Sequence, residues 1–287
     1  MKVLIVTHAG GPIGLGHLSR SLVVARALRD EADAEIHLLI QAEPIQRQEL
    51  STLPHEVVPP TEDLCAVTRR NLAAQDYHAL VFDLQRSRRP QGWHALTEAL
   101  RNERIVVAGI DDVLDLRPLL DLAFVPTFYL NPLLAEADDQ DTLWGWEYLL
   151  LGVAQPRPRP RLGERNALIL TGGSDVAGLG ARWPTALAAR LPEGFHVDWV
   201  TGPFSDPPAF PKEGGVSFAE HHAPSGLSSL MSKAGHALTI YGISFFELLY
   251  FGIPTVVYSP YGNRDVHQME ALRDAGVALV AETEDEA

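Results

Sequence analysis

The chain has 287 residues, of which 46% are hydrophobic and 21% are charged, and its formal net charge is −14. This length suits two domains of ordinary size, and the composition predicts a soluble globular protein. The negative charge argues against nucleic acid as a partner, because phosphate binding requires a basic surface. The single cysteine, Cys65, excludes an internal disulfide and a thiolate metal cluster.

No apolar run approaches the roughly 20 residues that a membrane-spanning helix requires. The first residues, MKVLIVTHAGG, are too short and too strand-like for a signal peptide, since their apolar part ends in a glycine-rich turn. We therefore expect a cytoplasmic protein without a transmembrane segment.

The N-terminal region predicts a strand over residues 2–7, the glycine-rich turn HAGGPIGLG and a helix over 18–29. Strand, glycine loop and helix form a ligand cradle in many α/β proteins. Gly14 and Gly16 let a substrate approach closely. His17 would lie beside the site, where a neutral imidazole takes up a proton near pH 7. The alternative is that His17 only caps the helix.

Further strand and helix units continue this pattern. Strands are expected over 35–40, 56–58, 79–82 and 105–110, and helices over 61–74 and 92–100. Asp83 follows the third of these strands, and Asp111 and Asp112 follow the fourth, at carboxyl ends where binding residues of parallel sheets lie. Each acid has a plainer interpretation as a cap of the next helix. Two acids can hold a divalent metal, but no dedicated metal spacing exists, and we predict no protein-bound metal.

The segment AQPRPRPRLG, residues 154–163, alternates proline and arginine and predicts an extended linker. We take the linker as 154–165, between a first domain of residues 1–153 and a second of residues 166–287. The second domain repeats the plan of the first, with a strand over 167–170, the loop TGGSD and a helix from about Gly178. Ligand binding between the domains, with hinge motion across the linker, is expected.

The most informative stretch runs from residue 236 to 268. It predicts a strand over 237–241, a break at Gly242, a helix that Gly252 ends, a strand over 255–258 and a polar loop before another helix. Ser244 and Glu247 have the spacing of a capping box. Glu247, Asp265 and Gln268 fall at the carboxyl edge of the expected sheet.

Helix N-termini at this edge offer free N–H groups and a positive dipole end, which suit phosphate. A carboxylate beside them suits the two hydroxyl groups of a ribose. These residues therefore predict a nucleotide or nucleotide-sugar pocket. The plainer alternative is that Glu247 is only a helix cap and that Gln268 is a solvated side chain.

The same motifs resemble those of two-domain (GT-B) nucleotide-sugar enzymes. GISFFELLYFGIP followed by PYGNRDVHQ is similar to the donor-binding half of the branch that holds PseG/SpsG-type UDP-sugar hydrolases and predicted glycosyltransferases, which is related to MurG-type glycosyltransferases. GLGHLSR resembles the first loop of this branch, and GGSD resembles the first loop of its second domain. The resemblance implies an α/β, GT-B-like fold of two Rossmann-like parallel-sheet domains facing a central cleft.

The resemblance also implies roles for individual residues. It implies that His17 is the general base and that Glu247 binds the ribose hydroxyls. It also implies that the GGSD loop and the loop at 263–268 bind the diphosphate. The expected substrate-binding residues are Gly14, Gly16, Arg20, Asp83, Asp111, Gly172, Gly173, Ser174, Gly242, Ser244, Glu247, Asn263, Asp265 and Gln268.

The resemblance has two departures. Where the hydrolases carry Arg-Ala-Asp at the end of the first strand, this chain has Thr7-His8-Ala9. His8 either adds a second imidazole to the site or is a strand-end residue without a role. GT-B enzymes usually end with a helix that returns to the first domain, whereas this sequence stops at Ala287, so we expect a trimmed chain or a different domain closure.

The function favoured by these observations is an inverting glycosyltransferase that uses a nucleotide-sugar, expected to be a UDP-sugar, without a cofactor. Its acceptor is not indicated by the residues. A PseG-like UDP-sugar hydrolase, with water as the acceptor, is one alternative. A non-catalytic nucleotide-sugar-binding partner or sensor is the other.

Overall fold

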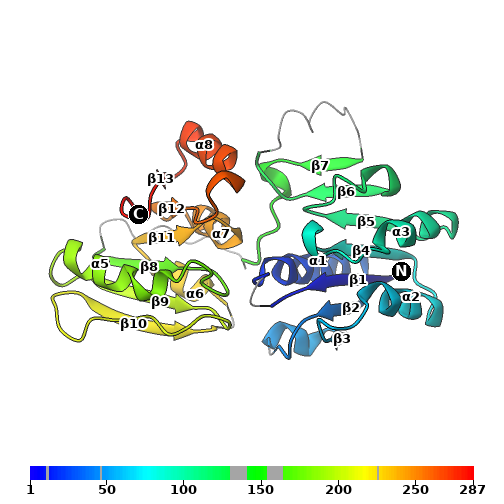
Figure 1. The fold of residues 1–287 in the computed structure, drawn as a ribbon, viewed down its shortest axis with the longest axis horizontal. Helices are drawn as coiled ribbons and strands as arrows, with labels where there is room; N and C mark the ends of the chain where they lie inside the picture. Colours follow the sequence, from blue (N-terminus) through cyan, green and yellow to red (C-terminus); the bar gives the residue numbers. More distant parts are fainter. Residues whose placement is uncertain (11–12, 46, 130–140, 154–163, 225) are drawn as a thin grey trace. The chain divides into compact units, whose positions relative to one another are not determined.

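The computed structural model describes residues 1–10, 13–45, 47–129, 141–153, 164–224 and 226–287. The chain divides into two compact units, an N-terminal unit of Met1–Gly152 and a C-terminal unit of Val153–Ala287 (Figure 1). Each is an α/β domain with its own parallel sheet. The predicted linker falls mostly on residues 154–163, which lie outside the described residues.

The N-terminal unit contains a seven-stranded sheet in the order β3-β2-β1-β4-β5-β6-β7, with every described pair of strands parallel. Its strands are β1 (Lys2–His8), β2 (Glu35–Gln41), β3 (His55–Val58), β4 (Ala79–Asp83), β5 (Val106–Ile110), β6 (Leu122–Val125) and β7 (Thr142–Trp144). Its helices are α1 (Gly16–Ala32), α2 (Leu64–Ala74) and α3 (Trp93–Asn102). The helix predicted from residue 61 begins at Leu64, because the carboxylate of Asp63 accepts the N–H groups of Cys65 and Ala66 and caps it.

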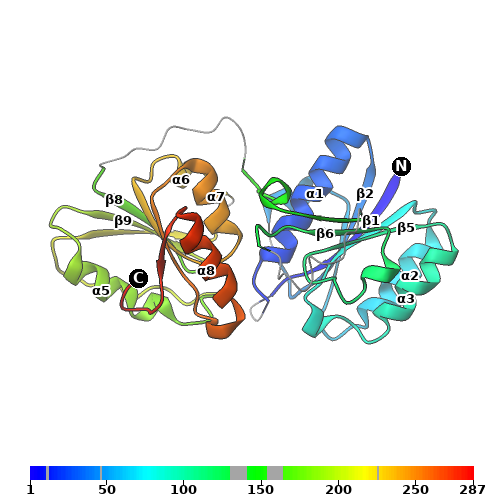
Figure 2. The same cartoon turned by 90° about the horizontal axis from the view of Figure 1, so that it is seen from above.

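Strand β1 is buried on both faces, as expected for a central strand of a parallel sheet that helices cover. Ile5 belongs to an apolar cluster with Leu22 of α1. Leu4, the preceding residue, belongs to a second cluster with Leu64 of α2 and Trp93 of α3. The apolar run at the N-terminus therefore builds both layers of the core, with α1 on one side of the sheet and α2 and α3 on the other (Figure 2).

The C-terminal unit contains a six-stranded parallel sheet in the order β10-β9-β8-β11-β12-β13. Its strands are β8 (Asn166–Leu170), β9 (His196–Thr201), β10 (Ser217–His222), β11 (His236–Ile240), β12 (Thr255–Tyr258) and β13 (Leu279–Ala281). Its helices are α5 (Trp183–Arg190), α6 (Ser228–Met231), α7 (Ile243–Phe251) and α8 (Val266–Ala275). On the central strand β8, Ile169 packs in a cluster with Trp183 of α5, whereas Leu168 packs in a cluster with Leu248 of α7.

Two details of the C-terminal unit differ from the sequence prediction. Helix α7 begins at Ile243 with Gly242 as its N-cap and without a side-chain cap, so the predicted Ser244–Glu247 capping box is wrong. Ser244 already lies inside the first helical turn, where its hydroxyl cannot cap that turn from outside. The helix predicted near Gly178 begins at Trp183, because Asp175 accepts the N–H groups of Leu179 and Gly180 and stabilises a 3₁₀ turn before it.

The strand order has one consequence for function in both units. In the N-terminal unit the chain runs outward from β1 to β2 and β3, and then returns to the other side of β1 with β4. In the C-terminal unit it does the same between β8 and β11. Ligands of open α/β sheets bind outside the carboxyl ends of the strands at this reversal of strand order. The loops after β1 and β4, and those after β8 and β11, are therefore the expected binding loops.

Candidate active site

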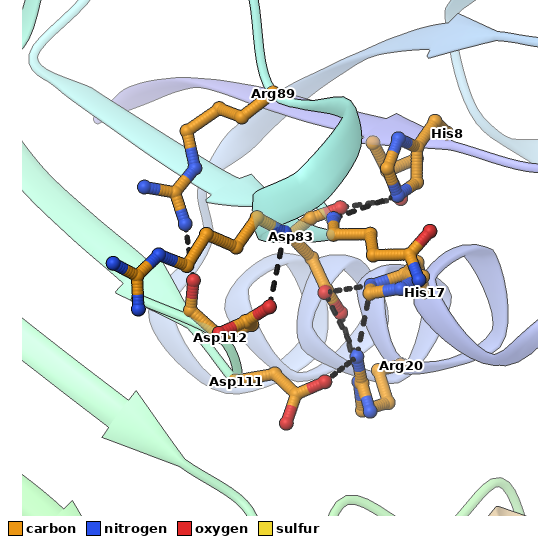
Figure 3. Close-up of polar contacts among 10 residues, drawn as sticks. His8, His17, Arg20, Asp83, Arg89, Asp111 and Asp112 are labelled. Carbon is orange, nitrogen blue, oxygen red and sulfur yellow. Dashed lines mark hydrogen bonds and ion pairs between the residues drawn. The ribbon is translucent and has the colours of Figure 1, made fainter. Parts of the chain in front are cut away.

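Four side chains from three segments meet at the reversal point of the N-terminal unit (Figure 3). His17 and Arg20 lie in the first turns of α1, Asp83 ends β4, and Asp111 follows β5. Arg20 and Asp111 are 91 residues apart in the sequence and in hydrogen-bond contact. The structure thus brings together four of the residues that the sequence had predicted as site residues.

His17 and Asp83 form a hydrogen-bonded pair in which the protonation of the imidazole can be assigned. Nδ1 of His17 lies 2.5 Å from Oδ1 of Asp83. Because a carboxylate only accepts, Nδ1 must carry the proton of this bond. Nη2 of Arg20 lies 3.0 Å from the same nitrogen, but its two N–H groups are used by Asp83 and Asp111. In neutral His17, Nε2 is therefore unprotonated and able to accept a proton.

Arg20 holds both carboxylates of the cluster. Its Nε lies 2.9 Å from Oδ2 of Asp83, and its Nη2 lies 2.9 Å from Oδ1 of Asp83 and 2.6 Å from Oδ2 of Asp111. Burial raises the pKa of Asp83, but the charge of Arg20 and the contact with His17 outweigh burial, and the net shift is downward. Burial also opposes the charge of Arg20, whose pKa is nevertheless raised by Asp111 and Asp83.

With His17 neutral, the cluster carries more negative than positive charge. Two carboxylates face one guanidinium, so with neutral His17 the four groups carry a net charge of −1. Taking a proton onto His17 makes the cluster neutral, and the resulting imidazolium keeps its bond to Asp83. The side chain of Asp83 has no exposed surface and that of His17 is 12% exposed, so water screens this attraction only weakly.

His8 lies beside this cluster at the end of β1 and is 1% exposed. Its Nε2 accepts the backbone N–H of Gln85 at 2.8 Å, and its ring meets that of His17 edge to face, with centroids 4.6 Å apart (Figure 3). Burial, followed by the proximity of His17, lowers the pKa of His8 to about 3. The ring is therefore uncharged near neutral pH, and it packs against the His17 ring of the cluster.

The neighbouring acid, Asp112, lies outside the cluster. Its carboxylate accepts the backbone N–H of Arg86 at 3.0 Å, and its carbonyl oxygen accepts a hydrogen bond from Arg89. Asp112 thus stabilises the loop after β4, which precedes it in the chain, and does not cap the next helix as its plainer interpretation expected. Asp111 instead turns toward Arg20 on a left-handed backbone with φ of 71°, a conformation that is uncommon outside glycine.

Gly14 and Gly16 lie after the end of β1 and at or just before the start of α1, the helix that carries His17. Gly14 has φ of 76°, which favours glycine, and it exchanges backbone hydrogen bonds with Gly10 at 2.7 and 3.2 Å. Gly16 is the first residue of α1. The pairing of Gly10 with Gly14 is accompanied by a ring contact between His17, the second residue of α1, and His8 at the end of β1.

One donor atom each from His17, Asp83 and Asp111 lie within 4.8 Å of one another, a spacing that a metal ion can span. The guanidinium of Arg20, however, already bonds both carboxylates at this place. The positive charge between the two acids is therefore supplied by the protein itself.

In the C-terminal unit the loop TGGSD follows β8. Gly172 has φ of 86°. A Cβ atom at Gly202 would lie 2.4 Å from the carbonyl oxygen of Gly173 and 2.5 Å from that of Gly172, so the loop after β9 packs directly on these two glycines. The backbone N–H of Phe204 also donates to the carbonyl of Gly173 at 3.0 Å. Gly202 was missed by the sequence analysis, where only its position after a strand could have indicated it.

The other predicted binding residues of this unit follow β11 and β12, the next two strands in the sheet. Gly242 precedes α7, whose first turns hold Ser244 and Glu247. Asn263 is exposed in the loop before α8, and Gln268 is partly buried in that helix. Asp265 is 7% exposed and accepts the hydroxyl of Ser259 at 2.6 Å, so it stabilises its own loop. Contacts of these residues with a ligand remain predictions.

No family model matches the chain, and no curated protein matches it. Its fold is similar to that of several solved structures. Acinetobacter baumannii MurG has a TM-score of 0.60 at 15% identity over 98% of this chain and 86% of MurG. The UDP-GlcNAc 2-epimerase from Neisseria meningitidis, bound to UDP-GlcNAc, has a TM-score of 0.58 at 15% identity over 100% and 88% of the two chains.

A third similar structure is the spinosyn rhamnosyltransferase SpnG complexed with thymidine diphosphate, with a TM-score of 0.61 at 16% identity over 100% and 88% of the two chains. With its two parallel α/β sheets, this chain has the GT-B fold. At these identities the similarity concerns the fold. Among the helices of the described residues, none has both the length and the apolar character needed to cross a membrane.

Proposed function

We propose that this protein is an inverting, nucleotide-sugar-dependent glycosyltransferase that takes a UDP-sugar as donor and uses His17 as its general base. The observation that carries the proposal is the 2.5 Å contact between Nδ1 of His17 and the buried carboxylate of Asp83. This contact orients the ring and leaves Nε2 unprotonated, as in other His–carboxylate pairs that remove a hydroxyl proton.

In this mechanism Nε2 of His17 takes the proton of the acceptor hydroxyl while the hydroxyl oxygen attacks the anomeric carbon of the donor. The bond from that carbon to the diphosphate oxygen breaks, and the diphosphate leaves with the electron pair. Direct attack inverts the anomeric centre. Asp83 stabilises the imidazolium that forms, and general base action of this kind contributes about 10²–10⁴-fold in rate.

The donor groups are assigned to the C-terminal unit. The backbone N–H groups of Gly172 and Gly173, the hydroxyl of Ser174 and the N-terminus of α7 would bind the diphosphate, and Glu247 would accept the ribose hydroxyls. The loops after β8 and β11 that carry these groups lie at the reversal of strand order, which supports the assignment. Two structures with this fold contain UDP-GlcNAc and thymidine diphosphate, which supports a nucleoside diphosphate as the leaving group.

The reaction would need no protein-bound metal or cofactor. Arg20 occupies the position between Asp83 and Asp111 that a cation would take, and it satisfies both carboxylates. In this proposal the charge of the leaving diphosphate is stabilised by helix N-termini and backbone N–H groups instead.

The test compares the wild-type protein with His17→Ala on a panel of nucleotide-sugars, using calorimetry for binding and NMR for products. Wild type should turn over one donor, and His17→Ala should lose at least about 10²-fold in kcat with an unchanged affinity for UDP. His94→Ala, an exposed histidine on α3, is the matched control. Unchanged turnover in His17→Ala would contradict the role of His17 as the general base.

The products decide the acceptor. A glycoside formed only when an acceptor is added supports transfer. Release of free sugar from the donor alone would mean that His17 deprotonates water instead of an acceptor hydroxyl, as in a hydrolase. Tight binding without turnover on any acceptor would contradict an enzymatic role and favour a nucleotide-sugar sensor.

A further inference from the structure

We propose that His8 is a positioning residue that holds both members of the His17–Asp83 pair in place, a role that rests on the function proposed above. No ligand or proton transfer is assigned to His8 itself. Two contacts, one to each side of the pair, carry the inference.

The first contact is with the ring of His17. The Cβ–Cγ bond and the hydrogen bond to Asp83 hold that ring at two points, which leaves only small rotations about χ1 and χ2. The edge-to-face contact with His8, at 4.6 Å between centroids and 82° between planes, restricts these rotations. The direction in which Nε2 of His17 faces the acceptor is therefore set by His8 and Asp83 together.

The second contact is with the segment that carries Asp83. Nε2 of His8 accepts the backbone N–H of Gln85, two residues after the catalytic carboxylate. The preceding residue, Thr7, donates its hydroxyl to the carbonyl oxygen of Asp83 at 3.3 Å. The end of β1 is thus fastened to residues 83–85 by two neighbouring side chains, in addition to the pairing of β1 with β4.

The same geometry excludes His8 from proton transfer. Because Nε2 receives an N–H donor, it carries no proton, and the proton of the neutral ring is on Nδ1. Burial, together with the charges of His17, Arg88 and Arg20, lowers the pKa of His8 and outweighs Asp83, the one group that raises it, so the ring stays uncharged. An uncharged ring neither competes for Asp83 nor repels the imidazolium of His17.

Three substitutions separate the two contacts. His8→Phe keeps a ring against His17 but removes the acceptor for Gln85, His8→Gln keeps an acceptor but removes the ring, and His8→Leu removes both. His8→Leu should lower kcat about 10- to 100-fold, because small misplacements of a catalytic group have effects of this size. The donor KM should stay within about 2-fold, and the two other variants should lie between His8→Leu and wild type.

A second readout does not depend on turnover. In ¹⁵N NMR of histidine-labelled protein, the His17 signals, assigned by their loss in His17→Gln, should show one tautomer with the proton on Nδ1. His8→Leu should show a mixture of tautomers, and His94→Leu should match wild type. Should His8→Leu not fold, His8→Phe and His8→Gln decide the question by the same measurements.

The outcomes separate this inference from the proposed function. A wild-type kcat together with a single unchanged His17 tautomer in His8→Leu overturns the positioning role. A mixed tautomer in His8→Leu supports that role even when wild type turns over no nucleotide-sugar, a result that would overturn the glycosyltransferase alone. Wild-type behaviour of His8→Gln in both readouts would overturn the ring contact.

Discussion

Arg20 and Asp83 are joined at two points, Nε to Oδ2 and Nη2 to Oδ1, each at 2.9 Å. The planar guanidinium matches the planar carboxylate in this fork, an arrangement that lysine cannot reproduce. Since the side chain of Asp83 has no exposed surface, its negative charge depends on this partner. The orientation of His17, the base of the proposed reaction, therefore depends on the buried ion pair between Asp83 and Arg20.

Replacing Arg20 by alanine should destabilise the N-terminal unit by about 3–5 kcal/mol, because it leaves a buried carboxylate without its main partner. Urea unfolding, followed by a probe of that unit, measures the change. Arg69→Ala, at an exposed position of α2, should change the free energy of unfolding by no more than about 0.5 kcal/mol. Equal effects of the two substitutions would contradict a structural role for the fork.

Asp83→Asn should lower kcat by roughly 10²–10⁴-fold while leaving UDP affinity nearly unchanged. The amide carries no charge to stabilise the imidazolium, and its NH₂ group can hold His17 in the wrong tautomer. Steady-state kinetics on the substrate identified above give the comparison. Asp112→Asn, which alters an acid outside the cluster, is the control. A similar loss of kcat in this variant would contradict a specific role for the His17–Asp83 pair.

His8 should make the stability of the N-terminal unit depend on pH. Its pKa is lowered from 6.5 to about 3 in the folded unit. Between these two pH values, His8 is protonated in the unfolded chain and uncharged in the folded unit. The stabilisation is fully present above about pH 6.5 and is lost as the pH falls toward 3, by up to about 1.4 kcal/mol per pH unit. Denaturant unfolding between pH 7 and 4.5 should show a shallower slope for His8→Gln than for wild type; equal slopes would refute the burial effect.

Gly202→Ala should weaken UDP binding about 10-fold or more and destabilise the C-terminal unit by about 1–3 kcal/mol. The added methyl group would lie 2.4 Å from the carbonyl oxygen of Gly173, so the glycine loop must move. Calorimetry with UDP and thermal unfolding measure the two effects. Gly226→Ala, where a Cβ atom meets nothing within 4 Å, should bind UDP like wild type.

Removal of divalent metals should not change the rate. Arg20 already supplies the positive charge between Asp83 and Asp111, so EDTA and added Mg²⁺ should both leave kcat within experimental error. A rate that falls with EDTA and returns with metal would instead assign His17, Asp83 and Asp111 to a cation.

The strands that carry the site could be predicted because central strands of parallel sheets are continuous apolar runs. In the run from Ala79 onward, Asp83 interrupts the apolar pattern at the carboxyl end of β4. The sequence was therefore sufficient to predict that Asp83 and His17 lie at the same edge of the sheet. It could not predict that they touch, since this depends on β4 lying next to β1 and on the two-point bond with Arg20.

Contacts between distant segments account for what the sequence analysis missed. His8 and Gln85 are 77 residues apart and are joined by a hydrogen bond from the backbone N–H of Gln85. A backbone donor leaves no pattern of residue types in the sequence. Gly202 packs on a glycine loop that is formed by a different strand. The capping box failed for a local reason, because the turn at Gly242 starts α7 one residue before Ser244. Spacing identifies a possible cap but not the residue at which the helix begins.

Each sheet takes all of its described strands from one half of the chain, so no described strand is exchanged between the two halves. A recombination event near residue 153 would therefore leave every described hydrogen-bonded ladder intact. Under the proposed function, the half that recognises the nucleotide and the half that carries the base can be inherited, replaced or grafted separately. Evolution could then change the acceptor of such a protein by exchanging one half while the other keeps its donor.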